Sequence, residues 1–332
     1  MHCRTSAHEA RPYRSLFSGL GFLLFFWLIW QAGPRLILDT LERVQIRWLP
    51  VYVASFFLIA TGIAFRWRMV LRALGVSVPL SSLLSMWFAG VTVSSVTTGA
   101  KLGGDPLRAF LLVKRPVPPG PAVASVIIDR AIELLANLSF AVVYCTLFAT
   151  RNQALGEQLL LAVVLGGLSF FAVGIYLVRR LGRGDSLMRG RFARMLERLG
   201  ATPEALIDIE DSLRLLLFQR RSQMGWIIGF ALFLNALIFL EFTIAFQVFA
   251  ASPTLPELAG AIMGVGLAHA LPIPGSVGAL EGAQAAIFSF QGSGTGLAVT
   301  AAIVARSRDL FRALPGAVLM VLGQTGQERT AE

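Results

Sequence analysis

The chain has 332 residues, of which 55% are hydrophobic and only 14% are charged. Soluble domains carry roughly 25% charged residues, so this composition excludes an ordinary water-soluble surface. The formal net charge is +10. In so apolar a chain, basic residues are expected to orient the protein in a membrane and not to bind nucleic acid. The predicted fold class is an all-α polytopic membrane protein.

The first apolar run, at about 16–32, follows a basic N-terminal stretch. This arrangement resembles a signal peptide. The run is long, however, and no clean small-residue cleavage site follows it. We expect an uncleaved first helix, with a cleaved signal peptide as the alternative.

Further apolar segments follow along the chain. They fall at about 49–65, 81–98, 121–149, 158–178, 225–250, 258–272, 279–290 and 297–323. Two of them make poor spanning helices, because 81–98 is rich in Ser, Thr and Gly, and 258–272 is short and ends beside two prolines. Non-helical backbone at membrane depth is tolerated only where protein surrounds it, so we expect these two segments inside the bundle.

The distribution of basic residues predicts the topology. The stretch 179–222 holds ten arginines against six acids, so it is expected on the cytoplasmic side. The N-terminus, Arg66, Arg68 and Arg72 are expected on the same side. This assignment holds only if 81–98 does not cross the membrane completely.

Two re-entrant hairpins satisfy that condition. The first runs through 81–98, turns at 98–100 and returns through 104–115, opening to the cytoplasm. The second pairs 258–272 with 279–290, turns at Pro274 and Gly275, and opens to the outside. The prediction is about six full transmembrane helices and two re-entrant hairpins, with both termini cytoplasmic.

An internal repeat supports this arrangement. When the sequence is shifted by 176 residues, its glycines and intramembrane charges coincide in these pairs: Gly90 with Gly266, Gly99 with Gly275, Asp105 with Glu281, Arg130 with Arg306, and Glu133 with Asp309. Because a single helix at 158–178 lies between the units, the second enters the membrane inverted. Inverted repeats with broken helices are typical of secondary transporters with a site near the midplane.

The whole chain, 1–332, is interpreted as a single integral membrane domain. Its parts are an N-terminal helix and loop (1–48), repeat unit A (49–149), a connector helix with a basic cytoplasmic loop (150–224) and the inverted repeat unit B (225–325). Loop 183–223 shows helical apolar spacing with basic flanks. It is expected to form surface helices on the cytoplasmic leaflet, with docking of a biosynthetic partner protein as the alternative.

Ionisable residues gather at predicted membrane depth, where insertion scales give a cost of about 2.5–3.5 kcal/mol for each charge. They are Lys101, Asp105, Arg108, Asp129, Arg130 and Glu133 in unit A, and Glu281, Arg306, Arg308, Asp309 and Arg312 in unit B. Such residues usually face a partner or a cavity.

Two interpretations of these charges stay open. In one, Asp105 pairs with Arg130 and Glu281 with Arg306, so that ion pairs lock each hairpin to a helix. In the other, arginine remains for an anionic phosphate or carboxylate, which a guanidinium binds in a bidentate way. The substrate-binding candidates are Lys101, Asp105, Arg108, Arg130, Glu133, Gly275, Glu281, Arg306 and Asp309.

No nucleotide-loop, zincin or nucleophile-elbow motif is present in the sequence. The two cysteines, Cys3 and Cys145, have no neighbours at ligand spacing. We therefore expect no enzymatic activity, no catalytic residues, no cofactor and no metal site.

Four stretches resemble motifs of the lysylphosphatidylglycerol synthase transmembrane-region family, also called flippase-like domains. They are 271–281 (LPIPGSVGALE), 101–108 (KLGGDPLR), 124–133 (ASVIIDRAIE) and 305–316 (ARSRDLFRALPG). The first is similar to the family's P-x-P-G-G-x-G-x-x-E element, with Ser276 in place of a glycine. Asp105 stands where glutamate is commoner. The resemblance spans roughly 50–325 and is closest to the hopanoid-biosynthesis-associated branch.

This resemblance implies translocation of a lipid, or a lipid-linked anionic headgroup, between the leaflets of the bacterial inner membrane. The soluble aminoacyl-transferase domain of fused family members is missing, so lysyl transfer is not implied. The alternative is a membrane enzyme or accessory subunit in hopanoid or polyprenyl-linked lipid biosynthesis. Membrane lipids are the expected partners, and nucleic acid is not.

Overall fold

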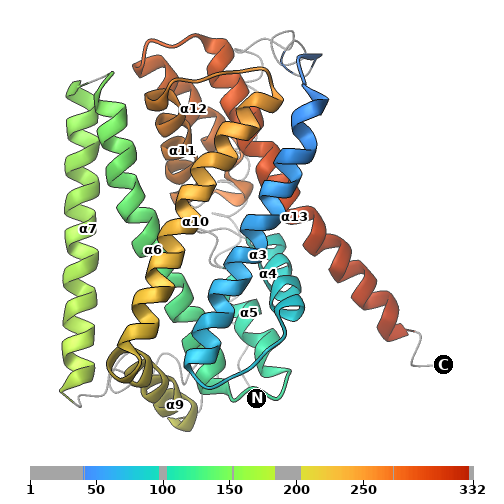
Figure 1. Ribbon diagram of the computed structural model, residues 1–332, viewed down its shortest axis with the longest axis vertical. Helices are drawn as coiled ribbons and strands as arrows, with labels where there is room; N and C mark the ends of the chain where they lie inside the picture. The colour runs from blue at the N-terminus through green and yellow to red at the C-terminus, as the bar shows by residue number, and fades with distance from the viewer. Residues whose placement is uncertain are drawn as a thin grey trace, which may run out of the picture.

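The computed structural model describes residues 40, 42–96, 103–151, 153–183, 203–271 and 273–328. These form helices, with no strand among them (Figure 1). The helices are η1 (Ile46–Trp48), α3 (Leu49–Ala73), α4 (Leu80–Val96), α5 (Gly104–Val113), α6 (Pro119–Ala149), α7 (Gln153–Gly182), α9 (Pro203–Arg214), η2 (Leu215–Gln219), α10 (Arg221–Val248), α11 (Leu255–Ala270), η3 (Pro274–Ser276), α12 (Ala279–Phe290) and α13 (Thr295–Glu328).

Four stretches among the described residues are long and apolar enough to cross a membrane. They are Ile46–Ala73, Pro119–Ala149, Glu157–Gly182 and Arg221–Val248, and they coincide with four of the six predicted crossings. The predicted crossing at 297–323 is also a single helix, α13, whose 34 residues span about 50 Å. It carries several charges, however. The predicted helix at 16–32 lies outside the described residues.

Local sequence explains where the helices begin. Pro119 opens α6, and a proline is well suited to the first turn because its missing N–H has no partner there. At α11, the Glu257 carboxylate accepts hydrogen bonds from both the backbone N–H and the hydroxyl of Thr254, each at 2.8 Å. This reciprocal cap starts the helix sharply.

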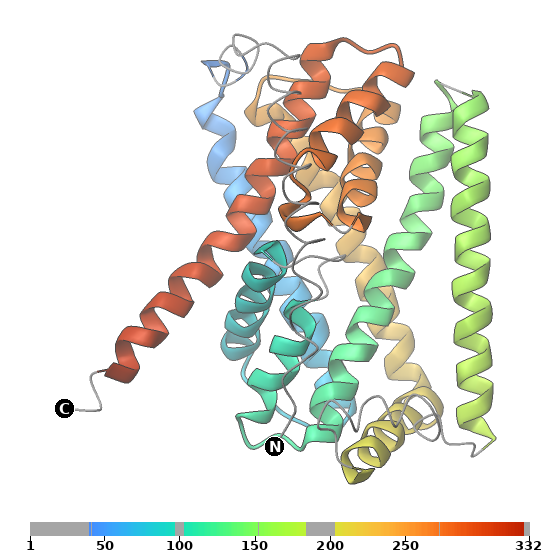
Figure 2. The same ribbon diagram turned by 180° about the vertical axis from the view of Figure 1, so that it is seen from behind.

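The two predicted hairpins enter the bundle from opposite ends. In Figures 1 and 2, α4 and α5 occupy the lower end, beside α9, whereas α11 and α12 occupy the upper end, where α13 begins. Their contacts with each other are extensive in both cases. The short lengths of all four helices, 17, 10, 16 and 12 residues, are too small for complete crossings.

The helix boundaries reproduce the repeat. Moving α3 to α6 by 176 positions places them at 225–249, 256–272, 280–289 and 295–325, within four residues of α10 to α13 at every end. In Figure 1, α3 descends where α10 rises, and α6 rises where α13 descends. The second unit is therefore an inverted copy of the first.

The two units interlock instead of standing side by side. Helix α4 of unit A packs along α13 of unit B, and α11 of unit B packs along α6 of unit A. Thr92 on α4 donates a hydrogen bond of 2.7 Å to the Ala313 carbonyl. At the same crossing, a Cβ at Gly316 would collide with the Phe88 carbonyl. Each hairpin is thus held by the last helix of the opposite unit.

The connector covers one side and the lower end of this core. Helix α7 packs chiefly on α6, while α9 lies across the lower end (Figure 1). Leu206 and Ile209 of α9 are buried against α3, α6 and α10, and Gly120 of α6 lets Asp208 approach closely. The described part of loop 183–223 is therefore helical, as predicted, but its apolar face packs on protein. Most of the remainder, 184–202, lies outside the described residues.

Candidate functional site

Unit A concentrates six charged side chains at membrane depth, on α3, α5 and α6. We call this set cluster A; it comprises Arg66, Asp105, Arg108, Asp129, Arg130 and Glu133. Asp129 lies at its centre and is fully buried. One of its carboxylate oxygens accepts from Arg66 Nε at 2.8 Å, and the other accepts from Arg108 Nη2 at 2.8 Å. A single carboxylate therefore joins α3, α5 and α6.

The remaining contacts of cluster A are longer and less buried. Arg130 reaches Asp105 at 3.6 Å and Glu133 at 3.4 Å. Arg108 lies 3.3 Å from Asp105, and Arg66 lies 3.5 Å from Glu133. Three guanidinium groups thus balance three carboxylates.

Aromatic packing orients Arg108 within this network. Its guanidinium carbon lies 4.1 Å from the centroid of the Trp67 ring, a cation–π distance. The Trp67 indole in turn donates to Ser125 at 3.1 Å. The backbones of α4 and α5 approach closely at Gly104, whose N–H donates to Ser94 at 3.0 Å, so there is no room for a side chain there.

Unit B arranges its charges as three separate pairs, all reaching α13. We call this set cluster B; it comprises Glu241, His269, Glu281, Arg306, Arg308 and Asp309. Arg308 lies 2.8 Å from Glu241 of α10, and the His269 ring of α11 lies 3.2 Å from Asp309. Arg306 binds Glu281 of α12 through Nε at 2.7 Å and Nη2 at 2.9 Å.

Arg306 also closes the tip of the second hairpin. Its guanidinium donates to the Gly275 carbonyl at 2.7 Å and to the Ser276 carbonyl at 2.9 Å. Gly275 and Ser276 both have positive φ, 59° and 50°, a conformation that glycine adopts readily and other residues rarely. Glu281 accepts from the Gly278 N–H at 3.0 Å. One arginine thus fixes the turn and the helix that follows it.

The tips of the two hairpins meet near the middle of the molecule. η3 contacts α4, and a Cβ placed on Gly275 would lie 3.5 Å from the Ser95 carbonyl oxygen. Figure 2 shows the two hairpins end to end between α6 and α13. This juxtaposition is what the inverted-repeat prediction requires.

The structure places most of the predicted site residues in the two clusters. Both predicted ion pairs, Asp105 with Arg130 and Glu281 with Arg306, are present, and Gly275 lies at the second hairpin tip. Lys101 and Gly99 lie outside the described residues. No leftover arginine remains in cluster A, because each of its three has a carboxylate partner.

Two important charges were missed or misplaced by the sequence reasoning. Arg66 was expected on the cytoplasmic side, and that expectation is wrong. Its side chain is buried, because α3 continues to Ala73 and carries Arg66 into the bundle opposite Asp129. Glu241 was not considered, although it is the single acid between 225 and 250. A lone carboxylate in a spanning segment is itself a signal of a buried partner.

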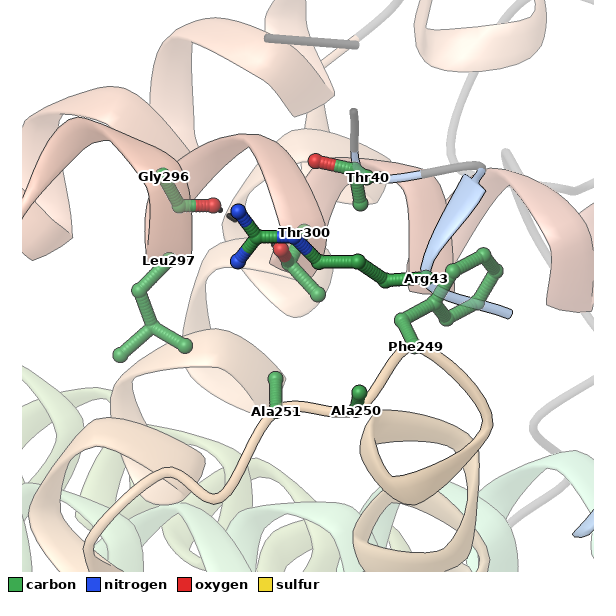
Figure 3. A pocket seen from close by; sticks show the side chains of 8 residues that line it. All are labelled: Thr40, Arg43, Phe249, Ala250, Ala251, Gly296, Leu297 and Thr300. Atoms are coloured by element: carbon green, nitrogen blue, oxygen red, sulfur yellow. Dashed lines mark hydrogen bonds between the residues drawn. The ribbon is translucent and has the colours of Figure 1, made fainter. Parts of the chain in front are cut away.

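A pocket of about 240 Å³ lies at the upper end of the molecule, apart from both clusters. Residues within 40–43, 249–251 and 296–300 line it. Figure 3 shows the Arg43 guanidinium extended across this pocket toward the Gly296 carbonyl, which also accepts from Thr300 at 2.9 Å. Within the described ranges, no group of three or more His, Cys, Asp or Glu residues is arranged to hold a metal ion.

Comparisons with known proteins agree with this architecture. A family described as "Lysylphosphatidylglycerol synthase TM region" matches residues 15–316. A UPF0104 membrane protein of Methanothermobacter thermautotrophicus is 24% identical over 303 residues, covering 86% of this chain and 88% of the relative. A second one from that organism is 26% identical over 311 residues, covering 86% and 84%. A UPF0104 membrane protein of Methanocaldococcus jannaschii is 26% identical over 150 residues, covering 44% of each chain.

Proposed function

The chain belongs to the lysylphosphatidylglycerol synthase transmembrane-region family, and from that premise we propose that it translocates a lipid, or a lipid-linked anionic headgroup, between the leaflets of the plasma membrane. Binding and release at the paired hairpin tips carry out this movement, without a covalent step. Membership of the hopanoid-associated branch stays a prediction.

One observation carries the proposal: Arg130 and Arg306 occupy equivalent positions in the inverted units and pair with equivalent hairpin acids. Their side chains keep 27% and 29% of their surface exposed, whereas Arg66 keeps only 2%. Partly exposed charges at membrane depth usually face a cavity or a pathway. The two arginines are thus suited to meet a ligand from opposite sides of the midplane.

The chemistry of exchange follows from the guanidinium group. A phosphate or carboxylate matches its planar donor fork as well as Asp105 or Glu281 does. When a headgroup displaces Glu281, Arg306 loses its tie to α12, and the carbonyls of the hairpin turn lose their donor. The tip then becomes free to move.

Interlocking of the units couples the two sides in this proposal. The α11–α12 hairpin packs on α6, which carries Arg130, and α4 packs on α13, which carries Arg306. Release of one tip therefore changes the packing around the other arginine. Alternating access by rocking of repeat units around a central site is the general mode of such folds.

We also propose an orientation. The lower ends of the helices in Figure 1 carry Arg72, Lys114, Arg115, Arg179, Arg180, Arg220 and Arg221. At the upper end, basic Arg43, Arg47 and Arg151 are accompanied by acidic Glu42, Glu157 and Glu257. An excess of Lys and Arg marks the cytoplasmic side. The first hairpin would then open to the cytoplasm, and α13 would end there.

The test is a transport assay with purified protein in vesicles of phosphatidylcholine containing a fluorescent anionic phospholipid. Chemical quenching from outside reports the leaflet of the label. Arg306→Ala and Arg130→Ala are expected to lower the translocation rate at least about tenfold, while Arg68→Ala, an arginine outside both clusters, leaves it unchanged.

A folding control accompanies these variants, because each leaves a carboxylate without its partner. The double variant Arg306→Ala with Glu281→Gln removes both charges of the pair. It is expected to regain thermal stability without regaining transport. Normal transport in the double variant would contradict the proposal, and a chemically altered lipid in a deletion strain would support the biosynthetic alternative instead.

A further inference from the structure

Four buried polar atoms without hydrogen-bond partners gather between α3, α10 and α13, on the upper side of the hairpin tips. They are Tyr52 Oη, Glu241 Oε1, Arg308 Nη2 and Arg312 Nε. We call the space they surround the Arg308 chamber. Tyr52, Glu241 and Arg308 are each more than nine-tenths buried. A buried polar group without a partner costs about 1–3 kcal/mol, so a set of four at one place calls for an explanation.

Several contacts bring these residues together. Arg308 Nη2 lies 2.8 Å from Glu241 Oε2 but outside hydrogen-bonding geometry, while Arg308 Nε donates to the same oxygen at 2.9 Å. The Tyr52 ring packs against Phe311 with centroids 5.6 Å apart. Its hydroxyl lies in the electrostatic field of Glu241, Arg308 and Arg312.

Neighbouring groups do not satisfy these atoms. The Ser307 hydroxyl is close to Tyr52, but it donates to the Val304 carbonyl at 2.8 Å. Arg312 lies near Asp309, whose carboxylate contacts His269. Within the described part of the chain, no hydrogen bond or ion pair holds the Arg312 guanidinium, in contrast to Arg306 and Arg308.

The chamber has a surplus of positive charge and of donors. Two guanidinium groups, from Arg308 and Arg312, face one carboxylate, Glu241. The partnerless atoms include three that can donate, on Tyr52, Arg308 and Arg312, and one that only accepts, on ionised Glu241. This combination matches a phosphate group, whose oxygens accept several hydrogen bonds, with a hydroxyl directed at Glu241.

We propose that the Arg308 chamber is a phosphate-binding site, filled by the headgroup of an anionic phospholipid or by free phosphate. Arg312 and Tyr52 contact the phosphate oxygens, and Glu241 accepts from a hydroxyl of the ligand. For its place in a transport cycle, as a station on the outer side of the hairpin tips, the inference rests on the proposed function. Binding itself can be measured without transport.

The experiment measures thermal unfolding of the purified full chain in phosphatidylcholine nanodiscs, with phosphatidylglycerol added to the bilayer or inorganic phosphate added to the buffer. A ligand that binds the folded state raises the unfolding temperature. The wild-type chain is expected to be stabilised, and Arg312→Gln to weaken the apparent affinity by about tenfold or more. Arg68→Gln is the matched control, because its Nε is also shielded and without a partner, yet it lies outside the chamber.

Tyr52→Phe keeps the test decisive even if Arg312→Gln folds poorly. Removing a partnerless buried hydroxyl should leave the ligand-free protein as stable as before, or more stable, while the stabilisation by ligand shrinks. Stabilisation by phosphatidylglycerol alone identifies a lipid headgroup, and stabilisation by inorganic phosphate alone identifies a soluble ligand.

The proposal is overturned if neither probe stabilises the wild-type chain, or if Arg312→Gln and Tyr52→Phe respond as the wild type does. Transport that fails while the chamber still binds phosphate would refute the proposed function and leave the site. Transport that persists without any binding here would refute the site alone.

Discussion

Clusters A and B begin from matching residues but are connected differently. In cluster A, Asp129 binds arginines from α3 and α5 and joins them to its own helix. In cluster B, three pairs stand separately. The repeat explains the difference, because Asp129 corresponds to Ala305 and Arg66 to Phe242. Unit B has no shared carboxylate and instead places an acid on its first helix and an arginine on its last, which reverses the polarity of unit A.

This difference teaches which half is anchored and which half is free to change partners. A carboxylate bound on both oxygens by two arginines has no capacity left for a ligand. The separate pairs of unit B leave atoms such as Glu241 Oε1 without partners. We infer that cluster A holds its helices together, whereas cluster B supplies the groups that exchange.

The largest expected effect comes from breaking the shared carboxylate. Asp129→Asn leaves two buried arginines without their common anion and should destabilise the protein by about 3–5 kcal/mol, because an uncompensated buried charge is costly. Glu241→Gln removes an anion that serves only Arg308, so its cost should be clearly smaller. Unfolding of both variants, measured by denaturant titration in detergent, checks this; equal losses would contradict the comparison.

A medium effect is expected at the equivalent arginines. Arg306→Lys loses the fork that binds Glu281 and the two turn carbonyls, and hydrogen bonds to charged groups are worth about 1.5–3 kcal/mol each. Arg130→Lys loses contacts of 3.4 and 3.6 Å, for which about 1 kcal/mol or less is expected.

The measurement for this pair of variants is the midpoint of thermal unfolding, together with proteolysis of the second hairpin. Only Arg306→Lys should make the turn at Gly275 more accessible to protease. If Arg130→Lys were the more damaging change, the assignment of cluster A as anchor through Asp129 would be incorrect.

The smallest effect is expected at equivalent glycines, and its sign should differ between the units. A Cβ at Gly90 would lie 3.0 Å from Arg108 Cγ, whereas one at Gly266 would meet nothing within 4 Å. Alanine is favoured over glycine inside a helix by about 1 kcal/mol. Gly266→Ala should therefore be neutral or stabilising, while Gly90→Ala should disturb Arg108 and offset that gain.

Thermal unfolding of the two alanine variants in one detergent provides the measurement. The Gly90→Ala variant should also weaken the Arg108 contact with Asp129, which a double variant with Arg108→Gln can test. Equal stabilisation by both alanines would show that α4 and α5 have more space than their close contact indicates.

Much of the architecture could be predicted from local properties of the chain. Apolar length predicted the four spans, and the glycines and charges repeated at 176 residues predicted the inverted units and both hairpins. The pairs of Arg130 with Asp105 and of Arg306 with Glu281 followed from that repeat. These succeeded because hydropathy and periodicity depend on neighbouring residues alone.

Other features depended on contacts between distant helices. The sequence by itself determined that charges lie at membrane depth, since composition and spacing place them there. Only the tertiary structure decided that Arg66 faces Asp129, that Glu241 faces Arg308, and that Arg312 remains without an anion. Those outcomes depend on how each helix is rotated about its axis, and packing of the whole bundle sets that rotation.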